Sequence, residues 1–222
     1  MESLNAEDRA ALLGAVHDFA SARLAPNASR WDAEKTFPID VLREAGELGL
    51  GGIYVNEDVG GSALSRFDAM AIFEELAKGD TAIAAYISIH NMVAWMIDAF
   101  GNLAQRQQWL PRLVTMEHLG SYCLTEPGAG SDAAAITTSA VVAGDEYVLN
   151  GTKQFISGAG ASAVYLVLAR TGVPGSHGIS AIVVPADAPG LSFGPNEKKM
   201  GWNARPTRRG FLGTVHGPIS NR

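Results

Sequence analysis

Residues 122–132 read Tyr122-Cys123-Leu124-Thr125-Glu126-Pro127-Gly128-Ala129-Gly130-Ser131-Asp132. The apolar run that ends at Leu124 predicts a strand, and the Pro and Gly residues after it predict a turn. Glycine lets backbone N–H groups close on the oxygens of a ligand, and Thr125 and Ser131 add a hydroxyl on each side. The residues leave two interpretations open: a loop that binds a nucleotide, or a tight loop without a ligand.

Two common nucleotide-binding loops do not fit this stretch. The dinucleotide fingerprint needs Gly-x-Gly-x-x-Gly between a strand and a long helix, and Ala133–Ala135 is too short to begin such a helix. The phosphate-binding P-loop ends in Gly-Lys-Ser/Thr, which the sequence lacks. A nucleotide site at this position would therefore belong to another kind of fold.

The residues before this stretch predict helices, because apolar side chains recur there every three or four positions. Caps and breakers mark the expected ends. Pro26 ends the first helix, and Gly49 ends a short one that follows Pro38. Ser65 and Asp68 form a capping box, and Asp80 and Gly101 bound a long apolar helix over 81–100. Asn102 begins another helix, which Pro111 breaks or restarts.

The residues after this stretch predict strands, because short β-branched or alternating runs follow one another without helices between them. The expected strands are 121–125, 136–142, 146–149, 153–157, 164–170, 179–184 and 191–193, with turns at Gly144-Asp145 and Asn150-Gly151. Such a series favours an antiparallel barrel or sandwich over a βαβ sheet. The predicted fold is an all-α helical bundle over residues 1–119, followed by an antiparallel β-barrel domain over residues 120–222.

Composition and charge exclude several classes of protein. The 222 residues are 47% hydrophobic, which excludes a disordered chain. The net charge of −6 divides into −8 over residues 1–120 and +2 over residues 121–222. No basic run indicates nucleic acid as a partner. The modestly basic second half suits an anionic small molecule, or forms an ordinary solvated face.

The single cysteine, Cys123, excludes an internal disulfide and a cysteine-rich zinc site, and the five histidines show no metal-ligand spacing. The first residues resemble neither a signal nor a transit peptide, so a cytoplasmic location is expected. His90, Asn91 and Asp98 interrupt the apolar stretch 81–100. We therefore expect a buried helix there and no membrane span.

The stretch Tyr122–Asp132 resembles the signature of the acyl-CoA dehydrogenase family. Residues 150–158, which read NGTKQFISG, resemble the second flavin-contacting segment of that family. Residues 197–203 (EKKMGWN), residues 206–208 (PTR) and the expected helix 102–112 agree with it as well. The Phe155-Ile156-Ser157 variant is most similar to the branch that oxidises isobutyryl-CoA, a short branched acyl-CoA.

The resemblance implies FAD as the cofactor, an acyl-CoA as the substrate and an FAD-dependent α,β-dehydrogenation as the reaction. The cofactor-binding residues that it implies are Tyr122, Leu124, Thr125, Gly130, Ser131, Phe155, Ile156 and Ser157. Leu124 and Thr125 would hydrogen-bond the polar edge of the flavin, Phe155 would shield one edge, and the Ser157 hydroxyl would reach flavin N5. Ser131 would also meet the pantetheine or a phosphate of CoA.

For the acyl group the resemblance implies Ala84, Ala85 and Ser88, where small side chains leave room for a branch. The same small residues also suit ordinary helix packing. Glu126 is the tempting general base because it is an acid within the motif, but the resemblance gives it a structural role.

The resemblance also implies a third, helical domain that holds the catalytic Glu beyond Arg222, so we expect no catalytic residue among these 222. Its implied partners are an electron-transferring flavoprotein and further copies of the chain in a homo-oligomer, a tetramer in the family. Oxidases share parts of the motifs, which leaves the electron acceptor open. Arg209–Gly217 carries three glycines that weaken strand propensity. The alternative hypothesis is a non-catalytic module that binds flavin or acyl-CoA, or an assembly partner.

Overall fold

The computed structural model describes residues 4–222, which divide into two compact units. One unit contains the described residues up to His118 together with Lys199–Arg205, and the other contains Leu119–Lys198 together with Pro206–Arg222. The sequence placed Lys199–Arg205 in the β domain. The segment goes with the helices because the Asp32 carboxylate accepts hydrogen bonds from the backbone N–H of Asn203 at 2.6 Å and from its side-chain amide at 3.2 Å.

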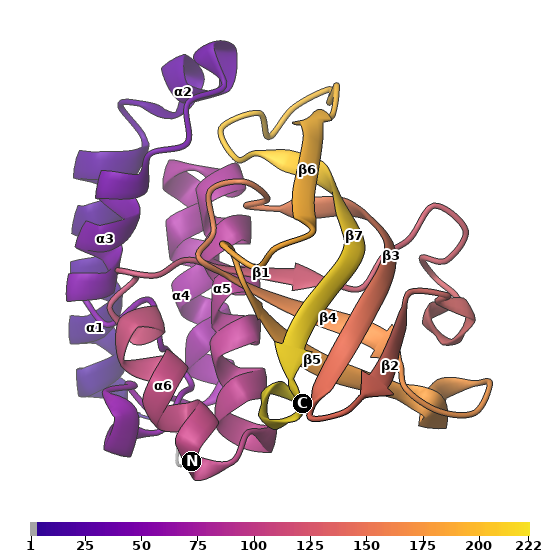
Figure 1. The fold of residues 1–222 in the computed structure, drawn as a ribbon. Helices are drawn as coiled ribbons and strands as arrows, with labels where there is room; N and C mark the ends of the chain where they lie inside the picture. The colour runs from indigo at the N-terminus through magenta and orange to yellow at the C-terminus, as the bar shows by residue number, and fades with distance from the viewer. Residues whose placement is uncertain (1–3) are drawn as a thin grey trace. The chain divides into compact units, whose positions relative to one another are not determined.

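Six α-helices build the helical unit (Figure 1). They are α1 (Ala6–Phe19), α2 (Ala28–Glu34), α3 (Ile39–Glu47), α4 (Arg66–Gly79), α5 (Thr81–Phe100) and α6 (Leu103–Val114), with a π-helical turn over Ala20–Leu24 after α1. The predicted caps are confirmed: the Ser65 hydroxyl accepts from the N–H of Asp68, and the Asp80 carboxylate accepts from the N–H groups of Ala82 and Ile83.

One local expectation for the helices is wrong, and one short helix was not predicted. Pro111 does not break α6, which runs through it to Val114. Leu110 and Leu113 are both fully buried on either side of it, so packing outweighs the loss of one backbone N–H. The short helix α2 has no counterpart in the sequence prediction.

Helix α5 is the core of the helical unit, as expected for residues 81–100. By length and composition alone it could cross a membrane, yet 56% of its most apolar window is buried. Its buried polar side chains are satisfied locally. The Asn91 amide donates to the carbonyl of Leu50 and accepts from the N–H of Ile53, and the His90 ring lies 2.9 Å from the carbonyl oxygen of Leu113.

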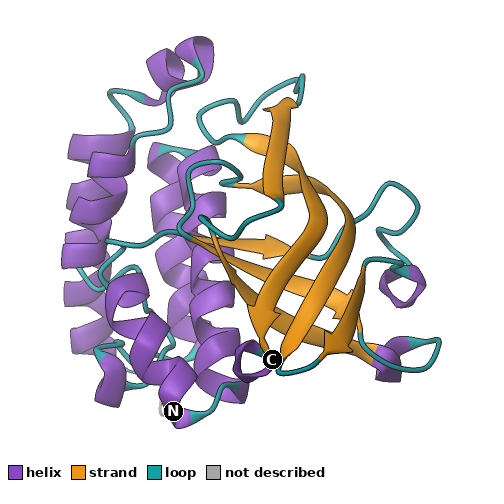
Figure 2. Ribbon diagram, in the orientation of Figure 1, coloured by secondary structure: helices purple, strands orange, loops and turns teal. Residues whose placement is uncertain are grey.

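The second unit is a seven-stranded sheet that curls on itself (Figure 2). Its strands are β1 (Gly120–Cys123), β2 (Ser139–Ala143), β3 (Glu146–Ser157), β4 (Val164–Arg170), β5 (Ile179–Pro185), β6 (Leu191–Asn196) and β7 (Thr207–Pro218). Their order is β1-β4-β2-β3-β7-β6, and β5 pairs with β4. Most pairs are antiparallel, as predicted, but β1–β4 and β2–β4 are parallel. The chain between β1 and β4 is long enough for the crossover that a parallel pair needs.

Two strands differ from the sequence prediction. Asn150-Gly151 is not a turn, because β3 continues through it with a shift in register against β7. The Asn150 side chain accepts a hydrogen bond from the N–H of Thr214 across that irregularity. The glycine-rich segment 209–217 forms β7 in spite of its low propensity, because it is paired with β3 on one side and β6 on the other.

Candidate functional site

The motif at 122–132 forms β1 and the loop that follows it, called here the 124–132 loop. Glu126 and Ala129 exchange backbone hydrogen bonds of 2.8 and 3.1 Å, which closes the turn around Pro127 and Gly128. The N–H of Gln154 on β3 donates to the carbonyl of Thr125 at 2.7 Å. The loop is therefore held against the strand that carries the second motif.

A buried ion pair fixes the start of the loop. Lys153 Nζ on β3 lies 2.8 Å from Glu126 Oε1 and donates to the carbonyl of Leu124 at 2.9 Å. Their side chains are only 1% and 4% exposed. The backbone N–H groups of Thr137 and Thr138 donate to the same carboxylate at 2.7 and 2.9 Å. All of these donors come from other segments of the β unit.

These partners decide the charge of Glu126. Burial alone would raise the pKa of its carboxyl, but the hydrogen bonds from Lys153 and from residues 137–138 lower that pKa to about 2. Burial lowers the pKa of Lys153, and Glu126 raises it in part. A carboxylate this acidic, with its oxygens already engaged, is a poor proton acceptor. The geometry therefore favours the structural role for Glu126 over that of a general base.

The glycines of the loop leave space that no side chain among residues 4–222 fills. A Cβ on Gly128 would meet no atom within 4 Å, and one on Gly130 would meet only Thr125 Cγ2 at 3.9 Å. Neither glycine has a left-handed backbone. Neither packing nor backbone conformation therefore requires glycine here, and the close approach of a ligand would require it.

Several polar groups of the loop have no partner among the described residues. No residue among 4–222 forms a hydrogen bond with the backbone N–H groups of Thr125, Gly130 and Ser131. The side-chain hydroxyls of Thr125 and Ser131 also lack a partner among these residues. Thr125 is half-buried, and Gly130 and Ser131 are exposed. Donors grouped in this way on a glycine-rich turn suit the phosphate and ring oxygens of a flavin nucleotide. The residues present thus fit FAD.

Strand β3 brings the second motif beside the loop. Phe155 has a left-handed backbone with φ 59°, lies in a register shift between Lys153 and Ile156, and keeps 57% of its surface exposed. A strained, exposed aromatic residue of this kind is typical of ligand sites. Ile156 is 2% exposed and packs into the core of the sheet, so its side chain is turned away from any ligand. The carbonyl of Ser157 accepts from the Ser121 hydroxyl at 2.6 Å.

The eight predicted cofactor residues thus lie in one unit, on β1, the 124–132 loop and β3. Tyr122 is half-buried on β1, where burial raises the pKa of its phenol. The three residues predicted for the acyl group lie in the helical unit, on α5. Ala84 is 4% exposed, which leaves its methyl group little surface for the predicted contact with a substrate. Ala85 and Ser88 are half-buried on a neighbouring face, where the Ser88 hydroxyl donates to the carbonyl of Ala85.

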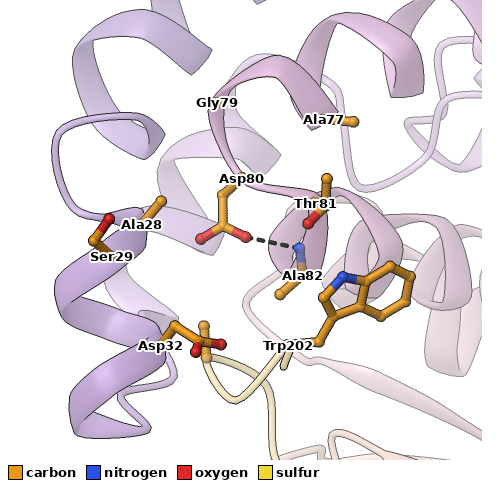
Figure 3. A pocket seen from close by; sticks show the side chains of 10 residues that line it. Ala28, Ser29, Asp32, Ala77, Gly79, Asp80, Thr81, Ala82 and Trp202 are labelled. Atoms are coloured by element: carbon orange, nitrogen blue, oxygen red, sulfur yellow. Dashed lines mark hydrogen bonds between the residues drawn. The ribbon is translucent and has the colours of Figure 1, made fainter. Parts of the chain in front are cut away.

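Sequence reasoning missed Lys153 and the two threonines that hold Glu126. The available signal was a lysine at the start of a predicted strand, two residues before Phe155. It also missed two cavities. One, of about 400 Å³, lies beside the loop between Glu126, Gly128, Thr137 and Thr152. The other, of about 320 Å³, lies in the helical unit between Asp32, Asp80 and Trp202 and contains none of the predicted site residues (Figure 3).

Two family models match the chain. The acyl-CoA dehydrogenase N-terminal domain covers residues 6–117, and the acyl-CoA dehydrogenase middle domain covers residues 121–215. The mitochondrial isobutyryl-CoA dehydrogenase of Dictyostelium discoideum is 54% identical over 216 residues, which are 97% of this chain and 52% of that protein. The chain thus spans about half the length of this curated relative.

Solved structures show the same fold. One, from work on the electron transferring flavoprotein of Acidaminococcus fermentans, has a TM-score of 0.93 at 34% identity. The match covers 100% of this chain and 59% of the solved chain. The acyl-CoA dehydrogenase complexed with FAD from Bacillus anthracis has a TM-score of 0.88 at 33% identity, and the match covers 98% of this chain and 37% of the solved chain. With both of its units matched in this way, the chain belongs to the acyl-CoA dehydrogenase family.

Proposed function

We propose that the chain contributes the flavin site and part of the acyl site to the FAD-dependent α,β-dehydrogenation of a short branched acyl-CoA, isobutyryl-CoA or a close relative. One observation carries the proposal: the unpaired N–H groups and open glycines of the 124–132 loop lie beside the part of β3 that carries the exposed Phe155 and the buried Ser157. The choice of acyl group is supported by the isobutyryl-CoA dehydrogenase relative.

FAD, when bound, supplies the chemistry of accepting the β-hydrogen of the acyl group as a hydride. Thr125, Gly130 and Ser131 would hold its polar atoms through their free N–H groups and hydroxyls. Phe155 would cover one edge of the ring, and the Ser157 hydroxyl would contribute at the reacting edge. The FAD complex of the Bacillus anthracis neighbour supports FAD as the cofactor.

The acyl group would lie against Ala85 and Ser88, whose small side chains leave room for a branch. A base must also take the α-proton, and Glu126 is unsuited to that task because Lys153 and two backbone N–H groups already hold its carboxylate. We propose that the base belongs to other residues of the active protein. An electron-transferring flavoprotein would then accept the electrons, a partner class supported by the Acidaminococcus neighbour.

The visible spectrum of the FAD-loaded active protein, which combines this chain with the residues that supply the base, tests the proposal when it is recorded without oxygen before and after isobutyryl-CoA is added. We expect the oxidised flavin band of that protein to fall with isobutyryl-CoA and to stay with acetyl-CoA, which has no β-carbon to oxidise. A band that persists with both would limit these residues to binding and would favour the non-catalytic module. Failure to retain FAD at all would overturn the proposal.

A further inference from the structure

Lys153 is the one lysine of the described residues whose side chain lies almost entirely inside the protein, at 1% exposed. It lies on β3 two residues before Phe155, and its ammonium points away from the second motif toward the first. Both of its hydrogen-bond acceptors, the carbonyl of Leu124 and the carboxylate of Glu126, belong to the 124–132 loop. They flank Thr125, whose own carbonyl is held by the N–H of Gln154.

Stability alone does not explain this arrangement. Burying an ammonium and a carboxylate removes the hydration of both, and packed apolar side chains of similar volume are commonly as stable or more so. What the pair adds is position. One ammonium holds the backbone carbonyl of Leu124 before Thr125 and the side-chain carboxylate of Glu126 after it, at the point where the open N–H groups of the loop begin.

We propose that Lys153 is a positioning residue for the cofactor: it holds the 124–132 loop in the shape that presents its free N–H groups to FAD. This inference rests on the proposed function, because it concerns the same site. It predicts that FAD affinity falls when the hydrogen bonds from Lys153 to Leu124 and Glu126 are lost. It also predicts that FAD affinity does not fall when the β unit is destabilised by other means.

Two variants separate these quantities. Lys153→Met leaves Glu126 as a lone buried charge, so it lowers the unfolding midpoint and also frees the loop. The double variant Lys153→Met/Glu126→Gln carries no lone charge, so its midpoint recovers toward wild type, while the tether to Leu124 stays absent. The Leu149→Ala control removes a fully buried side chain from the same strand and lowers the midpoint through a cavity alone.

FAD affinity is measured by quenching of flavin fluorescence, under conditions where denaturant curves show every variant to be folded. We expect the dissociation constant for FAD to rise roughly tenfold in both Lys153 variants, from the loss of two hydrogen bonds. In the Leu149→Ala control it stays within about twofold of wild type, since no bond to the loop changes.

Wild-type affinity in the double variant would overturn the inference, and so would a loss in Leu149→Ala as large as in Lys153→Met. Wild-type chain that binds no FAD would instead refute the proposed function, so the two failures are distinguishable.

Discussion

An alanine at Gly128 or Gly130 provides a selective test of the flavin site. Both positions lie in the 124–132 loop, and neither has a left-handed backbone. A methyl group at Gly128 would meet no atom of the chain within 4 Å, and one at Gly130 would touch only Thr125 Cγ2 at 3.9 Å. The substitutions therefore add volume only where the cofactor is proposed to lie.

Two effects of opposite sign are expected from these substitutions: one on the stability of the chain and one on its affinity for FAD. Without a clash, Gly→Ala restricts the unfolded chain and raises the free energy of unfolding by roughly 0.4–1 kcal/mol. Against a bound ligand the same methyl group is overpacked, at a cost of about 1–3 kcal/mol. That cost corresponds to FAD binding roughly 5 to 150 times more weakly.

Unfolding in urea and titration with FAD measure the two effects separately. Gly213→Ala on β7 is the matched control, because its methyl group would have only ordinary contact, with the carbonyl oxygen of Gly190 at 3.8 Å, and it lies outside the loop. We expect all three variants to be as stable as wild type or slightly more so, and only Gly128→Ala and Gly130→Ala to bind FAD weakly. Equal FAD affinity in all three would refute the reasoning that these glycines exist for the ligand.

Three further predictions concern the helical unit. Burial lowers the pKa of His90 to about 4 from 6.5, so the unfolded chain takes up the proton first as the pH falls. The free energy of unfolding should therefore fall by about 3 kcal/mol as the pH drops from 6.5 through 4. Urea unfolding curves across this range should show the loss, and His90→Gln should remove this pH dependence. Asp80→Ala should lower the free energy of unfolding by about 1 kcal/mol because α5 loses its N-cap, whereas Asp80→Asn should be nearly as stable as wild type. Equal losses of stability for the two variants in thermal melts would contradict the capping role of Asp80. Gly61→Ala should lower the free energy of unfolding by more than about 3 kcal/mol, because its Cβ would lie 2.1 Å from the carbonyl oxygen of Val55. A melting temperature equal to that of wild type would contradict this prediction and show that the turn adapts.

Local signals predicted those parts of the fold that local interactions determine. The helix caps at Asp80 and Ser65 were predictable because each involves residues at most three positions apart. Strand β4 begins and ends where its apolar run does. The change from helical to strand periodicity near residue 120 likewise predicted the order of the two kinds of structure.

Features set by distant residues were not predictable from the sequence alone. Asn150-Gly151 has the composition of a turn, yet β7 pairs along both sides of it and holds it in β3. Pro111 stays in a helix because the buried residues around it pack. Lys199–Arg205 joins the helical unit through a bond between residues 171 positions apart.

The same division holds for the candidate site. The composition of the 124–132 loop identified its glycines and hydroxyls as candidates, because that signal lies within nine consecutive residues. The burial of Lys153 and its reach to Leu124 depend on how β3 lies against the loop. The burial of Ala84 depends on which face of α5 packs inside its unit, and a uniformly apolar helix gives little indication of that.

The most direct test of the central claim is an amide NMR titration of the chain with FAD. The account predicts saturable shifts of the backbone N–H signals of Thr125, Gly130, Ser131 and Phe155, with signals from β5 and β6 unchanged. FAD binding that shifts other amides and leaves the 124–132 loop unaffected would contradict the account, as would the absence of any saturable change.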